Sequence, residues 1–183
     1  MKKYILLLII PFLSFGQFAI EKPNGWVSPD IDREENLQKY TLSEQETQKI
    51  LQSNNGELVI AFSKYDPAKY AGIIPTIQVT LLPNIYNNFT EFKNGITASI
   101  NIFDEAFQNF KIIKPLENIN LDGESGFFFQ CQFDLPVEDQ LITIRSWTYS
   151  ILVENKIFQI NFSDVEGDDC SDIYKKIIKT IEF

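Results

Sequence analysis

The sequence predicts an α+β fold in which an antiparallel sheet is flanked by helices. Three features of the chain carry this prediction. Apolar and polar side chains alternate over several segments, as they do in strands that bury one face of an antiparallel sheet. Other stretches repeat apolar residues every three or four positions, which is typical of amphipathic helices. Short turns separate successive strand segments, and hairpin connections of this kind favour an antiparallel arrangement.

The expected strands are short in the first half of the chain and long in the second. They cover residues 18–21, 57–63, 73–82, 112–121, 126–135, 141–153 and 156–163. In 126–135, one face carries Phe127, Phe129, Cys131 and Phe133, and the other carries Phe128 and three polar residues. This alternation predicts that one side of the sheet is buried and the other is mostly hydrated.

Three helices are expected. The first spans 43–52 and begins with a capping box, in which Ser43 and Glu46 each satisfy a backbone N–H of the first turn. The second spans 90–107, where Gly95 lowers helix stability by about 1 kcal/mol relative to alanine. The third spans 169–180, with acidic residues at its start and lysines in its second half, as the helix dipole favours.

The first 16 residues have the layout of a secretory signal peptide. Two lysines precede a short apolar run, and the small residues Ser14 and Gly16 precede a cut before Gln17. The run is interrupted by a proline and is shorter than the roughly 20 residues that a membrane-spanning helix needs. We therefore expect a signal peptide at 1–16, a single α+β domain at 17–183, and a periplasmic or extracellular protein whose mature chain has no membrane span.

Composition excludes several classes of function. The formal net charge is −9, which repels phosphate backbones, so no nucleic-acid partner is expected. The chain contains no histidine, which removes the usual Ser-His-Asp and Cys-His mechanisms and most zinc sites. The two cysteines form no CxxC motif, and no glycine-rich phosphate loop is present. We expect no cofactor and no catalytic residues.

The two cysteines, Cys131 and Cys170, leave two interpretations open. An oxidising compartment permits a disulfide between them. Alternatively both are buried thiols, and the position of Cys131 on the apolar face of its strand favours this interpretation.

An acidic cluster precedes the last helix and also has two interpretations. It contains Asp164, Glu166, Asp168, Asp169 and Asp172. Carboxylate oxygens are the ligands that calcium prefers, but the spacing departs from the EF-hand pattern. Acids at the start of a helix in a solvated loop explain the cluster without a metal. No metal site is expected.

Four residues are candidates for binding. Trp26, Tyr65 and Tyr70 lie near turns, where aromatic side chains form recognition sites, although aromatics in such places also complete hydrophobic cores. Arg145 lies in the middle of a strand and is one of two arginines. It is a candidate anion clamp, or else the partner of a salt bridge.

Three segments together resemble a known superfamily. They are the turn Pro23-Asn24-Gly25-Trp26, the strand Ile157-Phe158-Gln159-Ile160-Asn161-Phe162, and the closing helix from Tyr174 to Ile178 with the terminal Thr180-Ile181-Glu182-Phe183. This layout is similar to the PsbP-like superfamily, which comprises the photosystem II oxygen-evolution accessory proteins and their bacterial relatives. The resemblance implies an α-β-α sandwich and argues mildly against an enzyme. A histidine-dependent metal site of some relatives cannot carry over to this chain.

Three functional hypotheses remain. The first is a non-enzymatic binding or accessory module of the bacterial cell envelope, which uses a sheet face or a loop to contact an envelope protein or a small ligand. The second is a carboxylate-dependent hydrolase acting on an envelope glycan, which predicts a carboxyl group of raised pKa in a cleft. The third is a carrier for a small apolar ligand held between sheet and helix.

Overall fold

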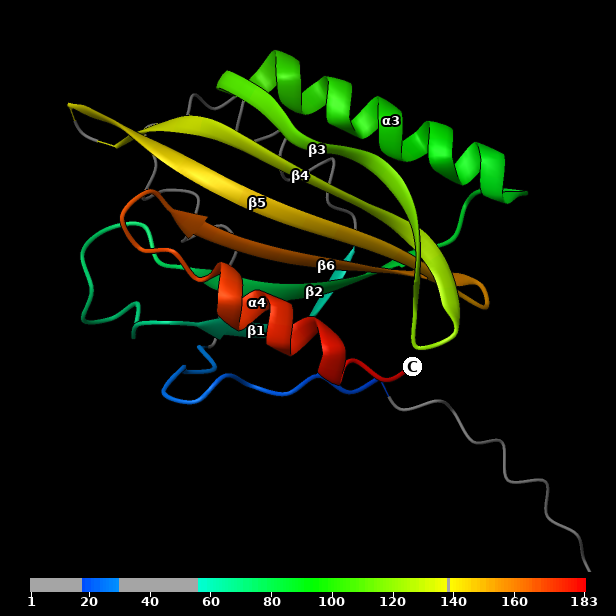
Figure 1. Ribbon diagram of the computed structural model, residues 1–183, viewed down its shortest axis with the longest axis horizontal. Helices are drawn as coiled ribbons and strands as arrows, with labels where there is room; N and C mark the ends of the chain where they lie inside the picture. Colours follow the sequence, from blue (N-terminus) through cyan, green and yellow to red (C-terminus); the bar gives the residue numbers. More distant parts are fainter. Residues whose placement is uncertain (1–17, 30–55, 138) are drawn as a thin grey trace, which may run out of the picture.

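The computed structural model describes residues 18–29, 56–137 and 139–183. The expected signal peptide and the expected helix at 43–52 lie outside these residues. The described elements, shown in Figure 1, are β1 (Glu57–Ser63), β2 (Thr76–Pro83), α3 (Phe89–Ala106), β3 (Gln108–Leu121), β4 (Glu124–Val137), β5 (Gln140–Val153), β6 (Lys156–Val165), α4 (Ser171–Ile177) and the 3₁₀ turn η1 (Ile178–Thr180).

The six strands form one antiparallel sheet in the order β1-β2-β6-β5-β4-β3. Hairpins join β3 to β4, β4 to β5 and β5 to β6, whereas α3 lies in the crossover from β2 to β3 (Figure 1). The pairing of β2 with β6 joins the two halves of the sheet. The predicted antiparallel sheet is therefore confirmed.

Several strand boundaries differ from the predicted ones. β3 begins at Gln108 instead of residue 112, and its pairing with β4 shifts register at three places. Asn109, in the left-handed region with φ 53°, lies within the first of these irregular stretches, where the alternation of side chains is lost. The predicted strand at 18–21 is reduced to one bridge, in which Ala19 exchanges backbone hydrogen bonds with Glu182.

The predicted second helix is confirmed as α3. Its N-cap is Asn88, whose side chain accepts a hydrogen bond from the Glu91 backbone N–H at 2.9 Å. The Glu91 carboxylate in turn accepts from the backbone N–H of Asn87 at 3.0 Å. These bonds satisfy the Glu91 N–H, which the first helical turn leaves without a partner, and the Asn87 N–H just before the N-cap. Phe92 and Ile96 then form the buried stripe of the helix.

The core is divided between the two faces of the sheet, which corrects the expectation of one buried and one mostly hydrated side. On one face, Phe92 and Ile96 of α3 pack on β4 residues that include Phe127, Phe129 and Cys131. Phe128 points to the other face, yet it is only 5% exposed because it packs against Tyr149. A strand with apolar residues on both faces is expected where each face is covered.

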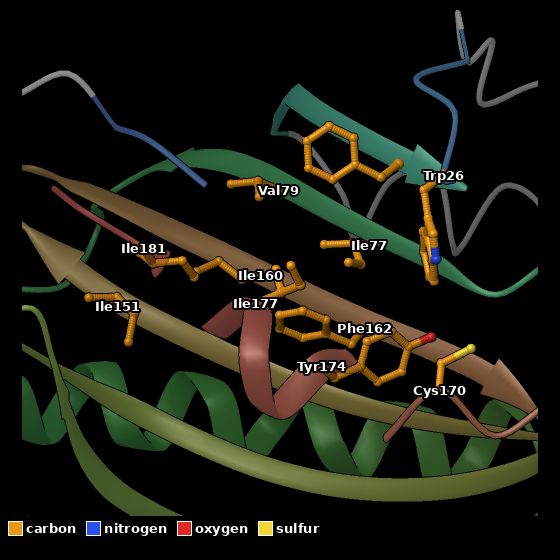
Figure 2. Packing of buried hydrophobic residues seen from close by; sticks show 11 residues of the cluster. Trp26, Ile77, Val79, Ile151, Ile160, Phe162, Cys170, Tyr174, Ile177 and Ile181 are labelled. Atoms are coloured by element: carbon orange, nitrogen blue, oxygen red, sulfur yellow. The ribbon is translucent and has the colours of Figure 1, made fainter. Parts of the chain in front are cut away.

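The second core lies beneath α4 and the chain ends. Figure 2 shows its labelled members converging from β2, β5, β6, α4 and the segment that contains Trp26. The buried residues are Trp26, Phe62, Ile77, Val79, Ile151, Ile160, Phe162, Cys170, Tyr174, Ile177 and Ile181. The α-β-α sandwich is thus confirmed in part: each sheet face carries one described helix, and each helix covers only part of its face.

The two cysteines belong to different cores, so the permitted disulfide is not formed. Both Cys131 and Cys170 are free and buried. Cys131 packs beneath α3, whereas Cys170 packs in the core beneath α4. The sheet itself separates them, and a disulfide requires Cα atoms within about 7 Å.

Candidate functional site

Three of the four candidate binding residues, Tyr65, Tyr70 and Arg145, lie at one end of the molecule. This end, called the loop end, comprises the β1–β2 connection (residues 64–75), the β6–α4 connection (residues 166–170) and the parts of β5 and β6 beside them (Figure 1). Arg145 contacts Asp169 and Tyr65 contacts Asp168, so two of the candidates meet neighbouring residues of one loop.

Arg145 forms an ion pair with a buried carboxylate. Its Nε donates to Asp164 Oδ1 at 2.7 Å, and the Asp164 side chain is 0% exposed. The second oxygen of Asp164 accepts from the backbone N–H of Cys170 at 2.8 Å. Nη1 of Arg145 also donates to Asp169 at 3.3 Å. This junction therefore ties β5 and β6 to the first residues of α4.

Asp164 has the raised pKa that the hydrolase hypothesis requires, but not the accessibility. Burial raises the pKa of Asp164, and the opposing hydrogen bonds from Cys170 and Arg145 lower it. Both carboxylate oxygens are occupied by protein donors, and the side chain is 0% exposed. A general acid must come within hydrogen-bond reach of its substrate. Asp164 therefore has a structural role.

A second contact fixes the β1–β2 connection to the β6–α4 connection. Asp168 accepts hydrogen bonds from Lys64 Nζ and, at 3.0 Å, from the Tyr65 hydroxyl. The hydrogen bond to Asp168 raises the pKa of both Lys64 and Tyr65, which stabilises their protonated forms. Tyr65 stacks on Tyr70 with ring centroids 4.5 Å apart, and Tyr70 is 43% exposed. Tyr70 is therefore the outer surface of a fixed aromatic pair.

Trp26 is a core residue. It is 5% exposed and meets Tyr174 edge to face, with ring centroids 6.3 Å apart (Figure 2). The Tyr174 hydroxyl donates to the Ser163 carbonyl at 2.6 Å. The turn before it forms as predicted, because the Trp26 N–H bonds to the Pro23 carbonyl and Gly25 takes a positive φ of 80°. Trp26 thus completes a core and has little surface to offer a ligand.

Four of the five side chains in the acidic cluster are paired with cations of the protein. Asp164 and Asp169 bind Arg145, Asp168 binds Lys64, and Asp172 binds Lys175. Across the ranges that the structure describes, no group of three or more Cys, Asp or Glu residues is arranged to hold a metal ion.

An open part of the sheet face beside α4 was not singled out from the sequence. α4 lies in front of β2 and β1, and no described element lies in front of the part formed by β3, β4 and the first half of β5 (Figure 1). Two rows of side chains cross this open face. One row runs Lys111, Gln132, Arg145, Asp164, and the other runs Lys114, Gln130, Trp147, Phe162.

The outer members of these rows are hydrogen-bond donors. We call Lys111, Lys114, Gln130, Gln132 and Trp147 the donor strip. Lys111 and Lys114 are exposed and the other three are half-buried. Within the described residues, no side chain of the strip has a hydrogen-bond partner. The alternating polar residues of β4 are visible in the sequence, but their alignment with Lys111 and Lys114 depends on the register between β3 and β4.

Arg145 links the donor strip to the junction. Its guanidinium lies over the Trp147 ring, 5.8 Å from the centroid, and Trp147 meets Tyr174 of α4 edge to face at 5.3 Å. Nη2 of Arg145 is the only buried side-chain nitrogen or oxygen without a partner among the described residues. The inner end of the strip is therefore held in place by packing and charge, as a recognition surface on rigid elements requires.

Comparison with known proteins shows the fold. No protein-family model and no curated protein matches the sequence. Among solved structures, LpqN of Mycobacterium tuberculosis, described as involved in cell envelope biogenesis, matches with a TM-score of 0.52 and 13% identity over 94% of this chain and 88% of LpqN. PA94 of Pseudomonas aeruginosa, of unknown function, matches with a TM-score of 0.50 and 13% identity over 69% of this chain and 82% of its own.

The third match connects the fold to the resemblance seen in the sequence. Cyanobacterial PsbP (CyanoP) from Synechocystis sp. PCC 6803 matches with a TM-score of 0.50 and 12% identity, covering 90% of this chain and 85% of its own. None of the described helices is long and apolar enough to cross a membrane. The six-stranded antiparallel sheet with its described helices is a PsbP-like fold.

Proposed function

We propose that this chain is an exported, non-enzymatic accessory protein of the cell envelope, which binds its partner on the donor strip. The observation that carries the proposal is the open sheet face itself. Five side chains with hydrogen-bond donors lie there together, and no described residue accepts from them. Polar groups that converge on one surface and are held by a rigid scaffold are the usual basis of specific recognition.

The fold supports an accessory role by analogy. LpqN, which is involved in cell envelope biogenesis, shares the fold, and so does CyanoP. Export is supported by the layout of residues 1–16, with basic, apolar and small-residue parts in the order of a signal peptide. Fold analogy alone does not assign a function, so the proposal depends on the surface chemistry.

No specific observation among the described residues favours the hydrolase or the carrier hypothesis. A hydrolase needs a carboxyl group of raised pKa that reaches its substrate, and Asp164 is enclosed by Arg145 and Cys170. A carrier for an apolar ligand needs a space between sheet and helix. The sheet beneath α3 is instead filled by aromatic side chains such as Phe92 and Phe127, whose ring centroids lie 5.3 Å apart.

Site-directed photocrosslinking tests the proposal in the exporting cell. A photoreactive amino acid replaces Gln132 on the donor strip in one variant and Lys93 on the exposed side of α3 in a matched control. We expect an envelope-dependent adduct from position 132 and none from position 93. Export is checked on the same protein by its N-terminal residue, which should be Gln17. Equal adducts from both positions, or an uncleaved cytoplasmic chain, would contradict the proposal.

A further inference from the structure

We infer that the ligand of the donor strip is an anionic polysaccharide, bound along the two rows that lead from β3 to Arg145. This inference rests on the proposed function, because it names the chemical class of the partner. It starts from the imbalance between donors and acceptors on this surface.

The donor strip offers donors of three kinds. Lys111 and Lys114 contribute ammonium groups, Gln130 and Gln132 contribute amides, and Trp147 contributes an indole N–H. The indole nitrogen has no partner among the described residues and is not one of their buried unpartnered atoms, so it reaches the surface. Only the two glutamines carry acceptors. A ligand that satisfies these groups must itself be rich in acceptor oxygens.

Charge is distributed unevenly on this face. The chain has a formal net charge of −9, yet three cationic side chains occupy the two rows with one carboxylate, that of Asp164. The single positive charge of Arg145 already faces the two carboxylates of Asp164 and Asp169, so only Lys111 and Lys114 supply positive charge to the strip. They form no ion pair among the described residues. A negatively charged ligand is therefore drawn to these two lysines.

Carboxylates limit the strip on either side. Asp134 lies beyond the row of Lys111, where Asn109 and Thr143 donate to it at 2.7 Å each and lower its pKa, so it stays charged. Glu117 lies opposite Phe128, beyond the row of Lys114. These acids confine an anionic ligand to a width of two rows, which is about 7 Å between side chains two residues apart on a strand.

The length and direction of the strip suit an extended polymer. From Lys111 to Arg145 the row crosses two strand spacings, or about 10 Å, so it accommodates a ligand that lies across the strands. Planar amides beside an indole can bind hydroxyl and carboxylate oxygens and contact the C–H face of a sugar ring.

An acidic polypeptide is disfavoured by the edge of the sheet. Extended peptides usually bind by adding a strand to an edge, which requires a regular row of backbone donors and acceptors. The nearest edge is β3, whose pairing is irregular at three places and which contains Pro115, a residue without a backbone N–H. A polymer that needs only side-chain donors meets no such obstacle.

The probe for this inference is polygalacturonate, a polymer of uronic acids, immobilised for biolayer interferometry at low and at physiological salt. Neutral dextran and poly-L-glutamate serve as comparison ligands. We expect the purified mature protein to bind polygalacturonate, to bind dextran at least tenfold more weakly, and to lose affinity as salt screens the lysines.

Two double variants locate the binding site. K111Q/K114Q should weaken binding at least tenfold, whereas K93Q/K156Q, which removes the same charge from exposed positions outside the strip, should leave it unchanged. Q130A/Q132A keeps the charge and should weaken binding severalfold. Absence of polygalacturonate binding, or equal loss in both lysine variants, would overturn the inference.

Poly-L-glutamate binding as tight as that of polygalacturonate would also overturn it, in favour of an acidic protein partner. If no polysaccharide binds but position 132 still crosslinks to a protein in the cell, the accessory role stands and only the ligand class is wrong.

Discussion

Replacing Arg145 with methionine tests whether the junction beneath the donor strip depends on a buried ion pair. Methionine keeps part of the apolar stem of the arginine but removes the guanidinium that lies over Trp147. Asp164, whose side chain is 0% exposed, then retains only the hydrogen bond from the Cys170 backbone N–H. The variant R145M therefore leaves a buried carboxylate without its counter-ion.

The free energy needed to protonate Asp164 sets an upper limit on the stability that R145M loses, and this limit depends on pH. Removing one partner of a buried ion pair costs about 3–5 kcal/mol. Asp164 can avoid this cost by taking up a proton. For a carboxyl group with an ordinary pKa of about 3.9, protonation requires at most about 4.2 kcal/mol at pH 7 and about 1.5 kcal/mol at pH 5. Since Arg145 is itself 25% exposed, we expect the lower end of the range, a loss of about 3 kcal/mol at pH 7.

The sign of the pH dependence follows from linkage. Burial already raises the pKa of Asp164, and loss of the guanidinium raises it further. The folded variant then holds a proton that the unfolded chain has released, so its stability increases as the pH falls from 7 towards 4. The difference from the unsubstituted protein should therefore shrink to about 1.5 kcal/mol or less at pH 5.

Urea unfolding followed by tryptophan fluorescence measures this difference, because Trp26 and Trp147 both contact Tyr174 in the affected core. The double variant D164N/R145M, which removes the uncompensated charge, should recover most of the loss at pH 7. K175M breaks an exposed ion pair and should change nothing measurable. The same loss at both pH values, or no recovery in the double variant, would refute the reasoning.

Three further predictions concern separate parts of the fold. Intact mass should show that both thiols are free, and both should resist a thiol reagent at pH 8 until urea is added, since both are buried and burial raises the pKa of Cys131 to about 12. A mass lower by two hydrogens, as a disulfide would give, would contradict this prediction. D168N should speed amide hydrogen exchange in residues 64–75, because Lys64 and Tyr65 lose their carboxylate partner, while the exchange of β4 stays unchanged; unaltered exchange in 64–75 would show that this contact does not hold the loop. G95A should lower the melting temperature although alanine favours a helix by about 1 kcal/mol, because the added methyl would overlap the Tyr86 ring; a more stable variant would contradict the packing.

Local patterns in the sequence were sufficient to predict the secondary structure of the described residues. Alternation and turn residues identified all six strands of the sheet, and the apolar stripe identified α3 within one residue of each end. The ends of strands are predicted less accurately, as for β3, because its irregular start interrupts the alternation. The last helix is shorter than predicted, since it becomes a 3₁₀ turn at Ile178.

Contacts between distant segments could not be predicted in the same way. Lys64 and Asp168 are 104 positions apart and meet only because β2 pairs with β6. The two cysteines are a case in which segments that could have met lie apart. Both occur in apolar surroundings, and only the sheet topology places them on opposite faces. The sequence leaves Arg145 as either an anion clamp or a salt-bridge partner, and only the position of Asp164 decides between the two.

The donor strip shows why a binding surface on a sheet can be hidden in its sequence. Lys111 and Lys114 are three residues apart, so in a regular strand they would point to opposite faces. Between the pairs Ile112–Cys131 and Lys114–Gln130, β3 contains one residue more than β4, and this bulge returns both lysines to the face of Gln130 and Gln132. A bulge depends on pairing between strands, which the residues of β3 alone do not specify. The surface that we propose as the binding site is thus produced by the irregularity that keeps the β3 edge from adding another strand.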